Sequence, residues 1–242
     1  MLKTSIQSHF RASPARLSPE LQNLLPGGVV AADMRGSGDV ADLWPAEAEC
    51  VQRAVPKRMR EFAAGRACAR HALRELGIED FALLAAHDRQ PIWPSSIVGS
   101  ITHTTGYCAA AVAPRRLLAG IGIDSEQVDQ VGRELWDTIC RPEEASWRDT
   151  LPAEQRQAAA ALLFCAKEAF YKYQYPLSGE WLDFHDLRVE PMEWGMGGMR
   201  SGQFTVRATR RILAEARSQW PVVGRFLFHE TFVTAAVAVP ET

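Results

Sequence analysis

The hydrophobic positions of the chain predict two long helices. The first runs from Val51 to Leu76 and ends at Gly77. Its apolar positions are spaced by seven, four and three residues, as on one face of a helix: Phe62, Ala69, Leu73 and Leu76. The second helix runs from Ala153 to Tyr173, and a shorter one is predicted around 129–140.

Shorter apolar runs, bounded by turn residues, predict strands. These are Val29–Met34, Ser100–Ala113 as one strand or a pair, Leu118–Asp124, Phe226–Phe228 and Phe232–Val239. Loops are predicted where Gly and Pro gather, at 35–39, 88–96 and 195–202. The chain is therefore expected to combine helices with sheets.

An internal similarity indicates two related halves. His103-Thr104-Thr105, followed by YCAAAVAP, resembles His229-Glu230-Thr231, followed by VTAAVAVP, at the same offset. The helices show a second similarity, between FAAGRA from Phe62 and FCAKEA from Phe164. Because both similarities occur in the same order, we expect two similar halves joined near 114–119. The boundary between such halves is a natural place for a ligand cleft.

Composition narrows the class of protein. The 242 residues carry a net charge of -2, with 47% hydrophobic and 23% charged residues, which indicates a globular chain of one or two domains. This balance argues against a nucleic-acid binder. The five cysteines include no C-x-x-C pair, so we expect reduced thiols and a cytoplasmic protein. No apolar run is long enough to span a membrane. Residues 1–28 lack the apolar region of a signal peptide and are interpreted as a poorly ordered extension, with an organelle transit peptide as the alternative.

The most informative acidic residues are Asp124 and Glu126. Alternate side chains of a strand share a face, so both carboxylates point the same way, beside Gly122. Neighbouring carboxylates repel each other unless a cation lies between them, and oxygen ligands suit Mg²⁺. Mn²⁺ would accept the same ligands. The alternative is a strand end whose acids face water.

The helix predicted around 162–173 supplies a further candidate acid. Glu168 and Lys172 are four residues apart and share one face. An exposed ion pair is the alternative, but this helix has little polar surface, and buried charges need a partner or a metal.

Basic and hydroxyl residues complete the candidate site. Arg66 falls on the apolar stripe of the first helix, where its guanidinium needs a counter-ion such as phosphate, whereas Arg70 and Arg74 are expected on a solvated face. Thr102 and His103 end a strand after Gly99, although a lone histidine is often structural. Without a Walker A, GxSxG, GxGxxG or HExxH motif, these residues indicate only that a phosphate-rich small molecule is bound.

Several stretches, taken in order, resemble the 4'-phosphopantetheinyl transferases of the Sfp type, and within them the subgroup of enterobactin synthetase component D. The stretches are KRMREFAAGRACARHAL (57–73), RQPIWP and VGSITH (89–103), GIGIDSE (120–126), FCAKEAFYKYQYPL (164–177) and WLDFHD (181–186). The resemblance implies an α+β fold of two similar halves, related by a pseudo-twofold axis, with the active site in the cleft between them. The corresponding division is 1–28, 29–116 and 117–242, the second part holding coenzyme A and the third the metal.

The resemblance also implies an activity. The enzyme would transfer the phosphopantetheine arm of coenzyme A to a serine of an apo carrier protein and release adenosine 3',5'-bisphosphate. A siderophore, polyketide or nonribosomal peptide pathway is expected, and a monomer would suffice. The implied metal ligands are Asp124, Glu126 and Glu168, and the implied catalytic residues are Glu168, Lys172 and His103. The implied coenzyme A contacts are Arg58, Arg66, Arg89, Thr102, His103, Lys167 and Lys172. Since carrier proteins are acidic, Arg70 and Arg74 would steer their docking.

Two positions depart from the family pattern. Ser125 replaces an apolar residue between the acids, which we expect to be tolerated on the far face of the strand. Arg89-Gln90 replaces Lys-Gly, which leaves the phosphate contact of that loop open. Two other functions remain as alternatives: a protein that binds coenzyme A or a carrier without catalysis, and a Mg²⁺-dependent phosphohydrolase.

Overall fold

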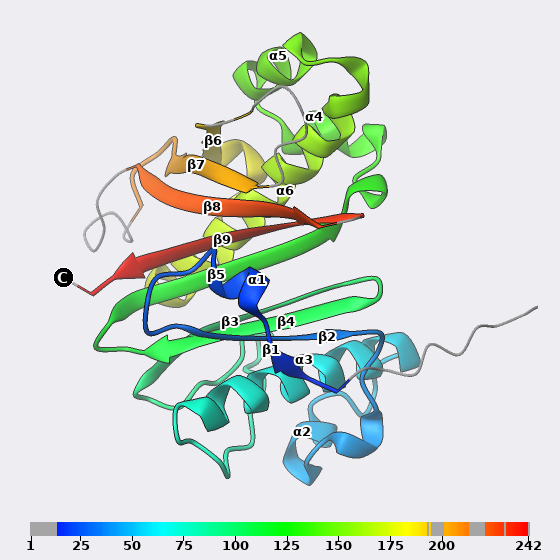
Figure 1. Ribbon diagram of the computed structural model, residues 1–242, viewed down its shortest axis with the longest axis vertical. Helices are drawn as coiled ribbons and strands as arrows, with labels where there is room; N and C mark the ends of the chain where they lie inside the picture. The colour runs from blue at the N-terminus through cyan, green and yellow to red at the C-terminus, as the bar shows by residue number, and fades with distance from the viewer. Residues whose placement is uncertain (1–13, 193, 195–200, 213–220, 230, 242) are drawn as a thin grey trace, which may run out of the picture.

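The computed structural model describes residues 14–192, 194, 201–212, 221–229 and 231–241 as two antiparallel sheets, each packed against one long helix (Figure 1). The first sheet has the order β1 (Arg16–Leu17), β2 (Val30–Arg35), β4 (Tyr107–Pro114) and β3 (Ile97–Thr104). The second has the order β5 (Leu118–Gln127), β9 (Phe232–Pro240), β8 (Val222–His229), β7 (Ser201–Ala208) and β6 (Leu187–Pro191). The α+β fold is therefore confirmed.

The helices match the two long predictions closely. Helix α3 (Pro56–Glu75) begins at a proline, whose missing N–H is not needed in a first turn, and α6 (Ala153–Ser178) ends before Gly179, whose φ is 68°. The short helices are α1 (Pro19–Gln22), α2 (Pro45–Glu49), α4 (Trp136–Ile139) and α5 (Pro142–Thr150). The short 3₁₀ helices are Val40–Asp42, Val128–Gln130, Arg133–Leu135 and Phe184–Asp186. The helix predicted around 129–140 is therefore only partly right.

The strand predictions are also confirmed in outline. Ser100–Ala113 proves to be a pair, β3 and β4, joined by a turn in which Gly106 has a φ of 74°. The predicted loop at 195–202 lies outside the described residues up to 200, and its end is wrong, because Ser201 and Gly202 belong to β7. Four of the five cysteines are buried and all are free thiols, as expected.

The two halves repeat the same topology. In each half the hairpin lies beside an earlier strand, giving the orders β2-β4-β3 and β5-β9-β8, and the long helix covers the sheet. A buried ion pair also repeats: Arg70 contacts Glu47 at 2.5 Å, and Lys167 contacts Glu144 at 2.7 Å. The expectation of two similar halves is therefore supported by features that the sequence comparison did not use. When Phe62 is aligned with Phe164, as in the sequence comparison, Arg70 is not aligned with Lys167. The sequence match and the repeated ion pairs therefore imply different alignments of the two helices.

These ion pairs correct two predictions. Arg70 is buried and also donates to the Asp42 carbonyl at 2.9 Å, so it does not lie on a solvated face available to a carrier protein. Lys167 is buried, and its ammonium donates to the carbonyls of Ile139 and Phe184 as well as to Glu144. Both cations are paired inside the protein, because a buried charge needs a partner of opposite charge.

The start of the described chain also differs from the expectation of a poorly ordered extension. β1 pairs with β2, and the Ser18 hydroxyl donates to Asp33 at 2.8 Å. Leu21, Leu24 and Leu25 are buried in a cluster that includes residues from both sheets. This segment therefore helps to hold the halves together. Within the part of the chain that the structure describes, no helix is long and apolar enough to cross a membrane.

Candidate active site

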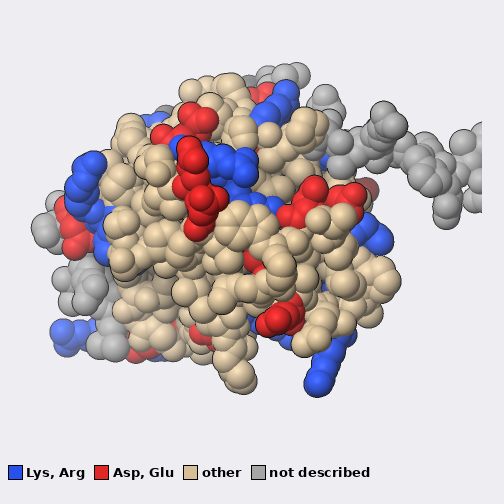
Figure 2. All heavy atoms as spheres, turned by 90° about the horizontal axis from the view of Figure 1, so that it is seen from below, with Lys and Arg blue, Asp and Glu red and all other residues tan. Residues whose placement is uncertain are grey.

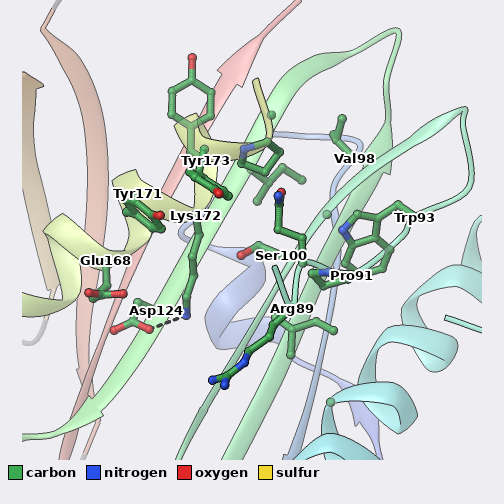
Figure 3. A pocket seen from close by; sticks show the side chains of 18 of the residues that line it. Arg89, Pro91, Trp93, Val98, Ser100, Asp124, Glu168, Tyr171, Lys172 and Tyr173 are labelled. Carbon is green, nitrogen blue, oxygen red and sulfur yellow. Dashed lines mark hydrogen bonds and ion pairs between the residues drawn. The ribbon is translucent and has the colours of Figure 1, made fainter. Parts of the chain in front are cut away.

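A cavity of about 640 Å³ lies between the two halves, where α3, β3, β5 and α6 meet a loop around Arg89–Trp93 (Figure 3). Arg58, Arg66, Arg89, His103, Asp124, Glu126, Glu168 and Lys172 all line it. The structure thus brings together eight of the ten site residues that the sequence indicates. The other two, Thr102 and Lys167, do not line the cavity.

The acidic wall of the cavity comes from β5 and α6. Asp124 and Glu126 are separated by one residue on β5 and share a face. Ser125 lies on the far face, as expected, and its hydroxyl lies 2.8 Å from that of Thr234. Gly122 lets α6 approach β5, because a Cβ there would lie 2.7 Å from the Tyr173 nitrogen and closer still to the Ala169 carbonyl oxygen. This close approach positions Glu168 and Lys172 beside the β5 acids.

Lys172 and Asp124 form the central ion pair of this wall. The Lys172 ammonium lies 2.7 Å from Asp124 Oδ1 and also donates to the Ile123 carbonyl at 3.2 Å. Figure 3 shows this pair at the end of the cavity where Glu168 lies. The other oxygen of the aspartate, Oδ2, is buried and has no hydrogen-bond partner among the described residues. A buried anionic oxygen without a partner is costly, so it indicates a place for a cation.

The other two carboxylates, Glu126 and Glu168, have raised pKa values even though Lys172 is nearby. Burial and the Asp124 charge together raise the pKa of Glu126 to about 7. Burial, followed by the same neighbouring charge, raises the pKa of Glu168. Three carboxylates around one ammonium are a donor set suited to a hard divalent cation. Within the described residues, no three Asp, Glu, His or Cys side chains lie close enough together, as they stand, to hold a metal ion.

His103 and Arg58 lie on the side of the cavity formed by the first half. Arg58 Nη1 lies 2.7 Å from His103 Nε2. A guanidinium has only donors, so Nε2 accepts this bond and a neutral ring carries its proton on Nδ1. Burial lowers the pKa of His103, and the Arg58 charge lowers it further, although Glu61 opposes the shift. His103 therefore presents a neutral imidazole with one N–H donor.

Arg66 is buried, and it forms no ion pair with a carboxylate of the described residues. Its Nε donates to the Leu83 carbonyl at 2.7 Å, and the guanidinium lies 3.7 Å from the centre of the Phe62 ring. Burial lowers the pKa of Arg66 to about 10, although Glu47 opposes this shift. Arg66 thus lines the cavity as a buried cation, and the counter-ion that the sequence indicates for it stays a prediction.

Arg89 lies on the wall opposite Lys172, and its guanidinium extends towards the acidic end of the cavity (Figure 3). Among the described residues it is the one non-glycine residue with a positive φ, 71°. The left-handed conformation costs a side-chain-bearing residue on the order of 1 kcal/mol, and such strain is concentrated at functional sites. The Asp88 carboxylate stabilises this turn by accepting from the Gln90 backbone amide at 3.1 Å.

Thr102 lies behind the acids rather than in the cavity. Its side chain is buried, donates to Asp124 Oδ1 at 3.2 Å and accepts from the Ser125 amide at 2.9 Å. The prediction that Thr102 contacts coenzyme A therefore fails, because its hydroxyl is already used by β5.

Two groups of cavity residues were missed by the sequence analysis. Arg115 lines the cavity from the link between the halves, where the Arg115-Arg116 pair was a visible but unused signal. Tyr171, Tyr175 and Trp181 form an aromatic cluster at the cavity, with ring centres 5.1 and 5.4 Å apart. Trp181 is 73% exposed, which is unusual for so large an apolar side chain.

The charges outside the cavity are mixed in sign. On the face seen in Figure 2, Lys and Arg side chains lie beside Asp and Glu side chains and form no single basic field. On α3, Glu61 lies 3.8 Å from both Lys57 and Arg58. Of the cations on α3, only Arg58 and Arg66 line the cavity, whereas Lys57, Arg60 and Arg74 are exposed outside it.

Comparison with known families identifies the whole arrangement. Residues 46–113 match the model of the 4'-phosphopantetheinyl transferase N-terminal domain, and residues 120–222 match that of the 4'-phosphopantetheinyl transferase superfamily. The 4'-phosphopantetheinyl transferase Npt of Nocardia iowensis is 34% identical over 222 residues, covering 90% of this chain and 99% of that protein. The chain belongs to the 4'-phosphopantetheinyl transferase family. It is accordingly an enzyme of that transferase class.

Further proteins are similar to this chain. The 4'-phosphopantetheinyl transferase Svp of Streptomyces mobaraensis is 38% identical, with 83% of this chain and 80% of that protein covered. Enterobactin synthase component D of Escherichia coli is 39% identical over 54% of this chain and 61% of that protein. A holo-(acyl-carrier-protein) synthase of Bacillus anthracis, solved with coenzyme A, aligns at 19% identity and a TM-score of 0.38 over 52% of this chain and 99% of that one.

Proposed function

We propose that the enzyme transfers the 4'-phosphopantetheine arm of coenzyme A to a serine of an apo acyl, peptidyl or aryl carrier protein. The observation that carries this proposal is one cavity in which Asp124, Glu126, Glu168 and Lys172 face four arginines, in a chain of this family. The similarity to enterobactin synthase component D supports a siderophore, polyketide or nonribosomal peptide pathway. The free thiols fit a reducing cytoplasm, and the cavity is complete in one chain, which suits a monomer.

Asp124, Glu126 and Glu168 would hold Mg²⁺ or Mn²⁺. The unpartnered Asp124 Oδ2 and the raised pKa of Glu126 support this assignment, because both are relieved by a cation. When bound, the ion would neutralise the pyrophosphate of coenzyme A. Movement of these side chains is required, since as they stand they are not gathered closely enough for coordination.

Glu168 takes the proton of the carrier serine in the proposed reaction. Burial and the Asp124 charge raise its pKa above that of a free glutamate, which makes the ionised side chain a stronger proton acceptor. The serine oxygen forms a bond to the phosphorus that carries the pantetheine arm, and the bond from that phosphorus to the bridging oxygen breaks. Lys172 stabilises the negative charge on the departing phosphate, which leaves as adenosine 3',5'-bisphosphate.

The first half of the chain binds the nucleotide in this proposal. Arg58, Arg66 and His103 supply N–H donors to phosphate oxygens, and Arg89 approaches from the facing loop. We divide the chain accordingly into a coenzyme A-binding half, 29–116, and a half that carries the acids, 117–242. Arg74, which is exposed on α3, remains a candidate for steering an acidic carrier protein.

Intact-protein mass spectrometry of apo carrier proteins tests the reaction. The carriers are incubated with the enzyme, coenzyme A and Mg²⁺, with EDTA and a Ser→Ala carrier as controls. Transfer predicts a gain of one phosphopantetheine that both controls lack. Coenzyme A bound without any gain would instead support a binding protein, and coenzyme A consumed without carrier modification would support a phosphohydrolase.

Glu168→Gln tests the proposed base. Glu154→Gln is the matched control, because Glu154 is exposed near the start of the same helix. We expect Glu168→Gln to keep its melting temperature and bind coenzyme A but to lose transfer by about 10²- to 10⁴-fold. Full transfer by this variant would refute the assignment of the base and of the metal ligand.

A further inference from the structure

The two halves meet along a row of side-chain hydroxyls. β3 ends the first sheet and β5 ends the second, and these two edge strands lie side by side. The backbone amides of β5 donate across this junction to three hydroxyls of β3. The distances are 3.1 Å from Ile123 to Ser100, 2.9 Å from Ser125 to Thr102 and 3.3 Å from Gln127 to Thr104. We call Ser100, Thr102 and Thr104 the hydroxyl row.

Each hydroxyl has a fixed role in this junction. A backbone N–H can only donate, so the hydroxyl accepts from it and keeps its own proton for another partner. Thr102 donates that proton to Asp124 Oδ1 at 3.2 Å, and Thr104 donates to Glu126 Oε2 at 3.1 Å. A backbone carbonyl in the same place could accept from β5 but could not donate to a carboxylate. The row therefore joins the halves and contacts the acids with the same atoms.

The spacing of the two strands explains why only two of the three hydroxyls reach an acid. In each case the carboxylate belongs to the residue just before the amide donor on β5. For Ser100, whose amide partner is Ile123, that residue is Gly122, which has no side chain. Ser100 thus makes the structural contact alone, which provides a natural control.

The consequence for Asp124 follows from its two oxygens. Oδ1 accepts from Thr102 and from Lys172, while Oδ2 accepts no hydrogen bond from the part of the chain that the structure describes. We propose that Thr102 and Thr104 are positioning residues that fix one oxygen of each β5 acid and leave the other for the divalent cation. This inference rests on the proposed function, because it assigns the cation to Asp124 and Glu126.

The test measures metal binding without turnover. Mn²⁺ alone is titrated into the full-length protein, and free Mn²⁺ is followed by electron paramagnetic resonance. The variants are Thr102→Val, which removes the hydroxyl at nearly constant shape, Thr102→Ser, which retains it, and Ser100→Ala. Thermal unfolding of each variant reports the loss of the shared structural contact.

We expect Thr102→Val to weaken Mn²⁺ binding by about 10- to 100-fold, the usual effect of losing an outer-shell partner. Thr102→Ser should restore binding, and Ser100→Ala should lower the melting temperature while binding Mn²⁺ like the unmodified protein. Equal Mn²⁺ affinity in Thr102→Val and Ser100→Ala would overturn the positioning role and leave the proposed function standing. An unmodified protein that binds no Mn²⁺ would overturn the metal assignment and the positioning role together.

Discussion

Replacing Gly122 with alanine tests whether the close contact between β5 and α6 builds the acidic wall. The added Cβ would lie 2.7 Å from the Tyr173 nitrogen, whereas ordinary contact begins at about 3.4 Å, and it would lie closer still to the Ala169 carbonyl oxygen. Both obstacles are helix backbone, so neither can rotate away. The strand and the helix must therefore separate by on the order of 1 Å, since overpacked interiors relax by shifts of the backbone.

Two measurable effects follow from this separation. Overpacking of this kind costs about 1–3 kcal/mol or more, which lowers the melting temperature of a chain this long by roughly 2–4 °C per kcal/mol. Glu168 and Lys172 lie on the displaced helix, opposite Asp124. A displacement of about 1 Å between reacting groups can reduce a rate about 100-fold. We therefore expect a folded but destabilised variant whose transfer rate falls far more than its fraction of folded protein.

The assay combines thermal unfolding with the rate of carrier modification followed by mass spectrometry. Gly27→Ala is the matched control, because an added Cβ at Gly27 meets no atom within 4 Å. It should melt and react like the unmodified enzyme. If Gly122→Ala also kept both its melting temperature and its transfer rate, the close contact would not be what positions Glu168, and the reasoning would be wrong.

Two further variants test other parts of the structure. Glu47→Gln removes the charge that pairs with the buried Arg70 at 2.5 Å, so we expect a loss of about 3–5 kcal/mol in the free energy of unfolding, measured by urea denaturation. Lys57→Ala, which breaks an exposed pair at 3.8 Å, should change it by less than about 1 kcal/mol, and equal losses would contradict the argument. Arg89→Gly should relieve the positive φ and raise stability by up to about 1 kcal/mol while raising KM for coenzyme A. An unchanged KM would remove Arg89 from the substrate contacts.

The sequence predicted most of the acidic wall because the residues of each pair lie close together in the chain. Asp124 and Glu126 alternate on one strand, and Glu168 and Lys172 are one helical turn apart, so each pair is fixed by its own element. The sequence placed Gly122 beside these acids, but it did not predict that α6 approaches β5 there. The sequence could not predict that Lys172 pairs with Asp124, since this contact depends on the packing of β5 against α6.

The errors concern residues whose partners are distant in sequence. Arg70 and Lys167 were expected to face solvent or substrate, but each is neutralised by a glutamate from a short helix far from it along the chain. Thr102 stands next to His103, yet the alternation of β3 turns its hydroxyl towards β5. Helical and strand periodicity predicts which face a residue occupies, but not which element covers that face.

The hydroxyl row also has a consequence for biosynthesis of the chain. An edge strand with unpaired backbone groups is a template for aggregation. When the first half leaves the ribosome, β3 is such an edge, and β5 is the strand that later covers it. Only residues 115–117 separate β4 from β5, so the covering strand is the next to be made. Because β5 is made directly after β4, the edge of β3 is exposed to other nascent chains for only a short time.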